Sequence, residues 1–364
     1  MPAKEFVNSC VSCKDAEASA TIRGRPLCQP CFLKYAGAKI HRSMTKFRPQ
    51  KDLPPTKLLV ALSLGTSSSA LLHFLHKLRD SQSSTFIGRA GFDLHVLVID
   101  PSSVFTDVPP VKANFDAVNE NYPGHEYSLV PLHSILSIDE DIKTTLRDFG
   151  FVDDESKSEK ERLDSFRQSI STATARTDID NLLLIRLVVT CAKKYGCEGV
   201  VWGDSDSRLA AKTLANVAKG RGGSLTWQVC DGPTPWGLEF CFPLRELYKS
   251  ELDLYVKYTP ELQGIVIPDK QTSENLSTRD LSIDALMNQY IATQGEKYPG
   301  VMANVVRTVN KLQPERRAIG DTRCSLCAAS LQHDTLSAER EDNAERICYA
   351  CLRSRDDMNT VSNT

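Results

Sequence analysis

Eight cysteines in four Cys-x-x-Cys pairs are the residues of this chain best suited to chemistry, and they form two tetrads near its two ends. The pairs of the first tetrad are separated by 14 residues and those of the second by 20, close to or within the spacing at which two knuckles hold one zinc ion. Four thiolates around one ion leave no position open for a substrate, so we expect two structural zinc sites. The predicted ligands are Cys10, Cys13, Cys28 and Cys31 in the first site and Cys324, Cys327, Cys348 and Cys351 in the second.

The other four cysteines show no Cys-x-x-Cys pair. Cys191 lies in an apolar helical pattern, where a cysteine is usually a small buried residue. A disulfide framework needs an oxidising compartment, but the first ten residues contain no apolar leader and no segment has the composition of a membrane span. We therefore expect a cytoplasmic protein with reduced thiols and no membrane partner.

A loop rich in Gly, Ser and Thr lies between an apolar run at 57–62, typical of a buried parallel strand, and a helical pattern at 70–78. A second strand is expected at 93–100, which completes a strand–helix–strand unit. Such a loop can bind phosphate through backbone amides and the helix N-terminus, or it can be an ordinary turn with a serine cap. The candidate cofactor-binding residues are Ser63, Gly65, Thr66, Ser67, Ser68 and, after a later strand at 200–203, Asp204, which could equally cap the next helix.

The alternation of strands and helices predicts an α/β fold, a parallel sheet with helices on both faces, flanked by a zinc module at each end. We expect domains at 1–50, 51–318 and 319–364. The stretch 139–165 is rich in acidic residues and predicts an exposed insertion. Further helices are expected at 182–195 (capped by Asp178 or Asp180), 207–219, 248–258, 281–293 and 301–312.

Charge is distributed unevenly along the chain. The whole chain has a formal charge of −2, which excludes a uniformly basic nucleic-acid coat, yet residues 1–51 carry a local charge of +7. This segment is a candidate RNA-facing surface, or the solvated face of a zinc module. The candidate RNA-binding residues are Lys39, Arg42, Lys46 and Arg48, together with Lys219, Arg221 and Arg245, whose alternative role is to satisfy a helix C-terminus.

Several segments together resemble the tRNA 2-thiolation proteins of the ATP-pyrophosphatase (PP-loop) superfamily, over nearly the whole chain. They are the two cysteine tetrads and five segments: 31–49, 59–69, 203–222, 243–245 and 348–351. The resemblance implies the PP-loop fold and ATP as the nucleotide of the loop. Active members carry Ser-Gly-Gly-x-Asp-Ser there, whereas this chain has Leu64 for the first glycine and Ser67 for the aspartate. We expect the Leu64 side chain to crowd a bound anion and the site to be weakened.

The catalytic relative in this family holds its sulfur-transfer centre with cysteines before the long central helix. Here the corresponding stretch, 169–176, contains no cysteine, so we expect no iron–sulfur cluster and assign no catalytic residue.

The resemblance therefore implies a non-catalytic or weakly active subunit of the cytosolic complex that converts the wobble uridine of tRNA to 2-thiouridine. Its implied partners are the catalytic thiolation protein, in a heterodimer, tRNA, and a ubiquitin-related modifier that supplies sulfur as a thiocarboxylate. Two alternatives stay open: an active ATP-dependent tRNA thiolase, and a scaffold of zinc modules with no RNA role.

Overall fold

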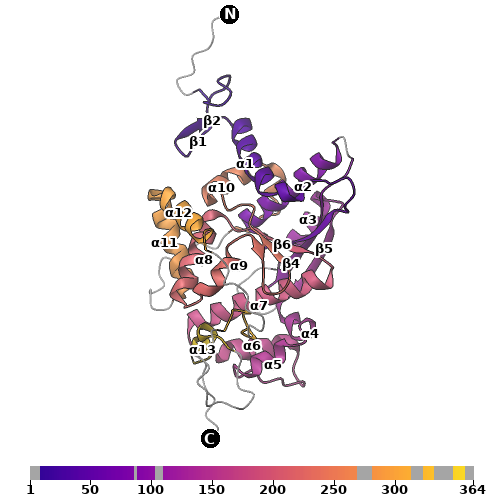
Figure 1. The fold of residues 1–364 in the computed structure, drawn as a ribbon, viewed down its shortest axis with the longest axis vertical. Helices are drawn as coiled ribbons and strands as arrows, with labels where there is room; N and C mark the ends of the chain where they lie inside the picture. Colours follow the sequence, from indigo (N-terminus) through magenta and orange to yellow (C-terminus); the bar gives the residue numbers. More distant parts are fainter. Residues whose placement is uncertain are drawn as a thin grey trace, which may run out of the picture.

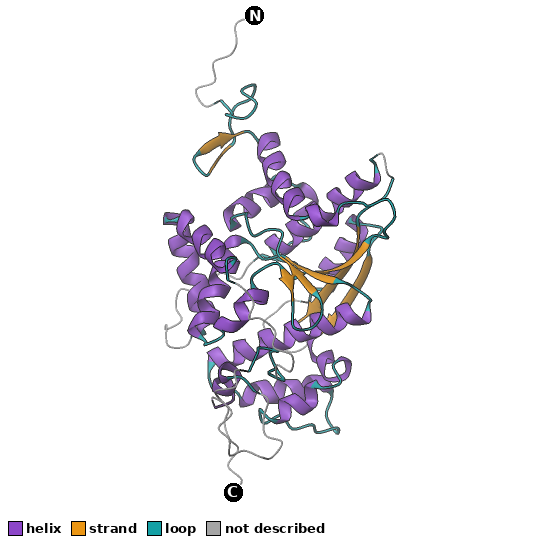
Figure 2. Ribbon diagram, viewed as in Figure 1, coloured by secondary structure: helices purple, strands orange, loops and turns teal. Residues whose placement is uncertain are grey.

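The computed structural model describes residues 9–85, 88–102, 110–268, 281–312, 323–331 and 347–356. This part of the chain is built around a six-stranded sheet, and a small two-stranded sheet lies near the N-terminus (Figure 2). The strands are β1 (Ala20–Ile22), β2 (Arg25–Leu27), β3 (Thr56–Ala61), β4 (Phe92–Asp100), β5 (Glu126–Pro131), β6 (Gly199–Trp202), β7 (Gly232–Pro233) and β8 (Glu239–Cys241).

The central sheet has the strand order β5-β4-β3-β6-β8-β7, and its neighbours are parallel except for β7 and β8. Leu58 of β3 pairs with Leu94 of β4, and Val60 of β3 pairs with Val201 of β6. The chain proceeds from β3 outward through β4 to β5 and then returns to the other side of β3. In such sheets, ligands bind outside the carboxyl ends of the strands at the point where the order reverses. That point here lies between β3 and β6.

Helices cover both faces of this sheet (Figure 1). The α-helices are α1 (Gln29–Ser43), α2 (Thr66–Ser83), α3 (Lys112–Asn121), α4 (Ile135–Ile138), α5 (Ile142–Arg147), α6 (Glu159–Ser169), α7 (Ala173–Lys194), α8 (Asp206–Ala218), α9 (Leu225–Gln228), α10 (Lys249–Lys257), α11 (Ile283–Lys297), α12 (Pro299–Val309) and α13 (Tyr349–Asp356). Short 3-10 helices are η1 (Thr45–Phe47), η2 (Leu132–Ser134), η3 (Gly222–Ser224) and η4 (Pro260–Leu262). None of the described helices combines the length and apolar composition needed to span a bilayer.

The sheet separates two apolar clusters because successive side chains of a strand point to opposite faces. Leu58 and Val60 of β3 belong to one cluster, with side chains of α1, α2 and α10, whereas Leu59 belongs to the other, with side chains of α7 and α8. The N-terminal cysteines Cys10 and Cys28 lie in the first cluster, and C-terminal cysteines lie in the second. Each terminal module is therefore continuous with the core on one side of the sheet.

The predicted strands at 57–62, 93–100 and 200–203 are confirmed as β3, β4 and β6. The predicted helices at 70–78, 207–219, 248–258, 281–293 and 301–312 are confirmed as α2, α8, α10, α11 and α12, within a few residues at each end.

The prediction that Asp178 or Asp180 caps the long central helix is wrong. Helix α7 begins two turns earlier, and the Thr172 side chain caps it by accepting from Ala175 N. Both aspartates lie within the helix and form ion pairs, Asp178 with Arg221 and Asp180 with Arg167.

The expectation of an exposed insertion at 139–165 is also wrong for its apolar residues. Ile142, Leu146 and Phe149 are each at most 1% exposed and belong to the cluster that contains α7. Asp139 is buried as well, and both of its oxygens bind Arg186 of α7, at 2.8 and 2.9 Å. This segment is therefore a folded part of the α/β core.

Candidate functional site

The two cysteine tetrads each bring four sulfur atoms together. Within each tetrad all four Sγ atoms lie within 4.8 Å of one another. The Sγ atoms of Cys13 and Cys28 are 3.8 Å apart, and those of Cys327 and Cys348 are 3.5 Å apart. Sulfurs at about 2.3 Å from a tetrahedral zinc ion lie about 3.8 Å from each other, whereas a disulfide bond would hold them at about 2.05 Å. The residues therefore fit two four-thiolate zinc sites.

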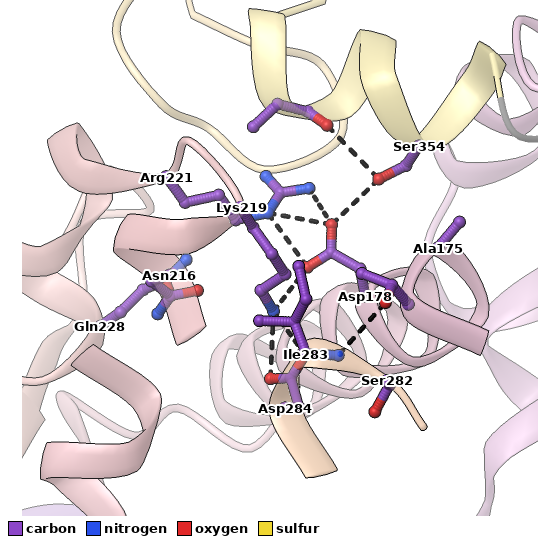
Figure 3. A network of polar contacts seen from close by, with 12 residues as sticks. Ala175, Asp178, Asn216, Lys219, Arg221, Gln228, Ser282, Ile283, Asp284 and Ser354 are labelled. Carbon is purple, nitrogen blue, oxygen red and sulfur yellow. Dashed lines mark hydrogen bonds and ion pairs between the residues drawn. The ribbon is translucent and has the colours of Figure 1, made fainter. Parts of the chain in front are cut away.

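The C-terminal tetrad contacts a buried polar network that Figure 3 shows from close by. The Arg221 guanidinium donates from Nη1 to Cys351 Sγ at 3.3 Å and from Nε to Asp178 Oδ2 at 3.0 Å. Lys219 Nζ also binds Asp178, at 3.0 Å, and Ser354 of α13 donates to the same carboxylate at 3.1 Å. Burial alone would raise the pKa of Asp178, but the charges of Arg221 and Lys219 hold it below its ordinary value. The network fastens the C-terminal module to helices α7 and α8.

Lys219 and Arg221 therefore do not lie on an RNA-facing surface. Their side chains are 6% and 2% exposed, and the negative charge of Asp178, together with Asp284 for Lys219, neutralises them. From the sequence, Asp178 is expected only as a candidate helix cap. A charged residue at helical spacing from Ala175 and Leu182, on an apolar face, was the signal that it has a buried partner.

A cavity of about 500 Å³ lies at the carboxyl ends of β3 and β6, where the strand order reverses. Leu62 and Ser63 reach it from β3, and Gly203 and Asp204 reach it from β6. Gly203 is required here because a Cβ atom would lie 2.6 Å from the Ser68 Cα atom of α2. The network around Asp178 forms another part of the wall. The cavity is therefore placed where nucleotide sites occur in doubly wound folds.

The loop before α2 keeps part of a phosphate-binding arrangement. The first amides of any helix have no intrahelical acceptor, and in the described structure no side chain caps α2, which begins after Gly65, so these amides are available to an anion. The Ser63 and Ser68 hydroxyls lie 3.0 Å apart, and both residues line the cavity. Gly65, Thr66 and Ser67 are not among the residues that line it.

The expectation that the Leu64 side chain crowds the anion site is wrong. Its backbone has φ 61°, a left-handed conformation that glycine adopts freely and that costs another residue about 1–2 kcal/mol. Its side chain is fully buried in the apolar cluster with α2, and its carbonyl accepts from Ile267 N at 2.8 Å. The loop thus keeps the backbone shape of a glycine at this position.

Asp204 lines the cavity and is not the helix cap. Ser205 caps α8 by accepting from Arg208 N at 3.3 Å. The Asp204 carboxylate instead binds Lys212 Nζ at 2.6 Å, and Arg208 lies 4.0 Å away. Two cations of α8 therefore stand at this end of the cavity.

The basic residues of the N-terminal segment divide into two groups. Lys39 of α1 pairs with Glu246 at 3.2 Å, and Lys46 of η1 pairs with Glu239, so these pairs join α1 and η1 to the central domain. Arg42 and Arg48 are exposed. Arg245 is mostly buried and binds Asp231 and the carbonyl of Val229.

Comparison with known proteins identifies the family. The chain is 49% identical to cytoplasmic tRNA 2-thiolation protein 2 of Aspergillus clavatus, over 98% of this chain and all of that relative. It is 45% identical to the protein of the same name from Coccidioides immitis, over 96% of this chain and 98% of the relative. The chain belongs to the cytoplasmic tRNA 2-thiolation protein 2 family. The model of this family itself matches residues 282–342.

A solved structure shows the same fold as this member of the cytoplasmic tRNA 2-thiolation protein 2 family. The U34-tRNA thiolase NcsA from Methanococcus maripaludis, determined with its 4Fe–4S cluster, aligns with a TM-score of 0.55 at 15% identity. The alignment covers 87% of this chain and 93% of the archaeal chain. The predicted PP-loop α/β fold is thereby confirmed.

The cysteines outside the tetrads are placed differently from metal ligands. Among the described residues, groups of three or more His, Cys, Asp or Glu able to hold one ion occur only at the two tetrads. Burial raises the pKa of Cys191 and Cys197 to about 11 and that of Cys241 to about 12, so these side chains stay protonated thiols. The absence of an iron–sulfur cluster remains a prediction for this family member.

Proposed function

We propose that this chain is a subunit of the cytosolic machinery that converts the wobble uridine, U34, of tRNA to 2-thiouridine. The observation that carries the proposal is the 49% identity, over nearly the full length of both chains, to relatives named cytoplasmic tRNA 2-thiolation protein 2. The fold shared with an archaeal U34-tRNA thiolase supports it.

In this proposal the chain is the non-catalytic half of a heterodimer with a catalytic thiolation protein. Sulfur transfer needs a thiolate that can reach the substrate, but the residues lining the cavity in the described structure include no cysteine. The thiolates of the tetrads are enclosed in coordination sets with no open position. The sulfur comes from a ubiquitin-related modifier with a C-terminal thiocarboxylate, and the catalytic partner transfers it.

The cavity is, in the same proposal, a weakened nucleotide site. Mg²⁺ bound with ATP prefers carboxylate oxygens, and the loop has Ser67 where active members carry aspartate. Asp204, which lines the same cavity, is already paired with Lys212. The serine hydroxyls and the start of α2 favour an anion but offer no free carboxylate for its metal ion.

The chain contributes part of the tRNA-binding surface through its N-terminal segment. Arg42 and Arg48 are exposed there, and exposed cations attract the phosphate backbone without reading its sequence. Crosslinking of tRNA to this segment, and its loss when both arginines are changed to glutamate in a folded protein, test this part. Crosslinking that is unaffected by the charge reversal contradicts it.

The deciding experiment measures 2-thiouridine in cytosolic tRNA from cells that lack this chain and are rescued with wild type or Gly65→Arg. Gly65 directly precedes α2 and has φ −75°, an ordinary backbone conformation for other residues, so the arginine tests the loop with a long side chain at the start of the helix. We expect thiolation to disappear on deletion and both versions to restore it.

Two other outcomes contradict the proposal in different ways. Rescue by the wild type alone, at equal protein levels, shows that nucleotide binding in the loop is needed and supports an active thiolase. An unchanged 2-thiouridine content in cells that lack this chain contradicts any role of the chain in thiolation.

A further inference from the structure

A second, smaller cavity of about 140 Å³ lies between the N-terminal module and α12, outside the nucleotide-like cavity. We call it the 206 cavity after the residue in its wall whose hydrogen bonding is incomplete. Its wall comes from the β1–β2 turn, α1, the start of α8, the segment before α10, and α12. The residues that matter below are Arg23, Lys39, Asp206, Arg245, Glu246 and Arg307.

The 206 cavity joins residues that the sequence suggested separately for RNA binding. Lys39 of α1 and Arg245 of the central domain both line it, although they are far apart in the chain. Arg307 of α12 joins them; it is exposed and forms no ion pair within the described part of the chain. Three cations of the wall are already paired, Arg23 with Glu251, Lys39 with Glu246 and Arg245 with Asp231. Within the described residues, the Arg307 guanidinium is therefore the cation of the wall that is left to bind an anionic ligand.

Asp206 has an unused hydrogen-bond acceptor. The residue is 2% exposed, and its Oδ1 atom accepts from the Ser207 hydroxyl at 2.9 Å and from Ser207 N. Its Oδ2 atom is buried and has no hydrogen-bond partner in the described structure. Burial raises the pKa of this carboxyl to about 7. An unpaired buried acceptor costs about 1–3 kcal/mol, so a hydroxyl donor at this place would be bound favourably.

Arg245 offers a second unused group. Its terminal nitrogens bind Asp231, the carbonyl of Val229 and the side chain of Asn310, whereas its buried Nε has no acceptor among the described residues. Two residues of the wall therefore carry a covered and unsatisfied group in the described structure, an acceptor in Asp206 and a donor in Arg245, and the exposed Arg307 guanidinium lies in the same wall. A ribose 2′-hydroxyl both donates and accepts, and a phosphate pairs with a guanidinium.

The size of the 206 cavity restricts its ligand. Cavities that bury a whole small molecule measure about 300–1,000 Å³, well above the 140 Å³ here. A space of this size fits one unit of a longer polymer whose remainder lies on the surface.

We propose that the 206 cavity binds one ribose–phosphate unit of RNA, with Asp206 accepting a hydrogen bond from the 2′-hydroxyl and Arg307 pairing with the adjacent phosphate. That this RNA is tRNA rests on the function proposed above. Because Oδ2 is covered in the unbound structure, a wall side chain changes rotamer when the hydroxyl binds. The cavity thereby distinguishes RNA from DNA at one nucleotide.

The test measures the affinity of the full chain for one tRNA anticodon stem–loop made as RNA and as DNA, by fluorescence anisotropy over a series of salt concentrations. Asp206→Ala should lower the RNA-to-DNA affinity ratio about fivefold to tenfold, the effect of one hydrogen bond, while DNA binding stays the same. Asp206→Asn should keep most of the ratio, because the amide can donate to the hydroxyl oxygen.

Arg307→Ala should give a different signature. It should weaken RNA and DNA binding equally and reduce the salt dependence by about one phosphate contact. The matched control is Arg147→Ala, because Arg147 is also exposed and ends helix α5 at the opposite end of the molecule (Figure 1). Thermal melting confirms that each variant is folded.

Two results overturn the inference. The ribose–phosphate site is contradicted if Asp206→Ala leaves the RNA-to-DNA affinity ratio unchanged, or if Arg307→Ala binds nucleic acid like Arg147→Ala. Either result leaves the proposed function intact. A wild-type chain that binds neither nucleic acid overturns this site and the tRNA-binding role together, although loss of 2-thiouridine on deletion would still support a thiolation subunit.

Discussion

Replacing Arg221 with methionine should weaken the attachment of the C-terminal module to the core that it covers. Methionine keeps most of the length and apolar contact of the side chain but removes the guanidinium. That group joins three parts of the chain, namely Arg221 itself after α8, Asp178 in α7 and Cys351 in α13.

The magnitude follows from burial. The side chains of Arg221 and Asp178 are 2% and 5% exposed, and breaking a buried pair by removing one partner costs about 3–5 kcal/mol. Asp178 keeps its contacts to Lys219 and Ser354, so we expect the lower end, about 3 kcal/mol. Loss of the donor to the Cys351 sulfur should also weaken zinc binding about tenfold, because partners beyond the ligands tune metal affinity.

Urea unfolding with zinc present measures the first effect, and zinc transfer to a chromogenic chelator measures the second. The matched control is Arg208→Met, the same replacement at a side chain that is 50% exposed and 4.0 Å from Asp204. An exposed pair of this kind contributes about 0–1 kcal/mol. We expect faster release of half of the zinc in Arg221→Met and no change in Arg208→Met.

The reasoning is refuted if the two variants unfold within about 1 kcal/mol of each other and release zinc at the same rate. That result would mean that the guanidinium contributes no more than a surface cation, and that packing alone holds the module.

Three further predictions test other parts of the structure. Asp206→Asn should raise the free energy of unfolding at pH 8 by up to about 4 kcal/mol but should leave it unchanged at pH 4. Burial gives the Asp206 carboxyl a folded-state pKa of about 7, above the unfolded value, so the wild type loses stability as the pH rises from the unfolded-state pKa to the folded-state pKa. Equal urea unfolding curves for the two proteins at pH 8 would contradict this prediction. Leu64→Gly relieves about 1–2 kcal/mol of backbone strain but removes a fully buried side chain, so urea unfolding should show a net destabilisation of about 2 kcal/mol. A stabilised variant would show that packing of the Leu64 side chain contributes less than the strain costs. Elemental analysis should find two zinc ions per chain in the wild type and one in Cys351→Ser, with a lower melting temperature, and two ions in the variant would exclude Cys351 as a ligand.

The sequence predicted best the features that depend on neighbouring residues. The run from Leu58 to Leu62 is apolar on both faces, which is the pattern of a central parallel strand, and it became β3. The tetrads could be assigned from spacing because the ligands of each pair are adjacent in the chain. The loop after β3 was likewise found from its position between a strand and a helix.

The errors came from contacts between distant residues. The acidic stretch at 139–165 is too polar, in its overall composition, for a buried segment to be predicted there. Its apolar residues Ile142 and Leu146 nevertheless share one buried face of α5. The charge of Asp139 is compensated by Arg186, which lies 47 residues further along the chain. Arg221 looked like a surface cation, as most arginines are, because its partner Asp178 lies 43 residues upstream. The incomplete hydrogen bonding of Asp206 depends on several elements at once, and local sequence carries no signal of it.

The burial of the C-terminal tetrad in the α7 side of the core has a consequence for how the chain is made. Domains begin to fold from the N-terminal end during synthesis, and the buried residues of the cluster that includes Cys10 and Cys28 extend only to Ile265, so this cluster can close before the C-terminal module is made. The opposite cluster lacks Cys324, Cys327 and Cys351 until the last part of the chain has been translated and has taken up its ion. Until then Asp178 and Arg221 lack their cover from α13, and the apolar surface beside them is open to chaperones and proteases. A shortage of zinc would therefore reduce the amount of this protein in the cell through degradation of nascent chains, before it affected any molecule already folded.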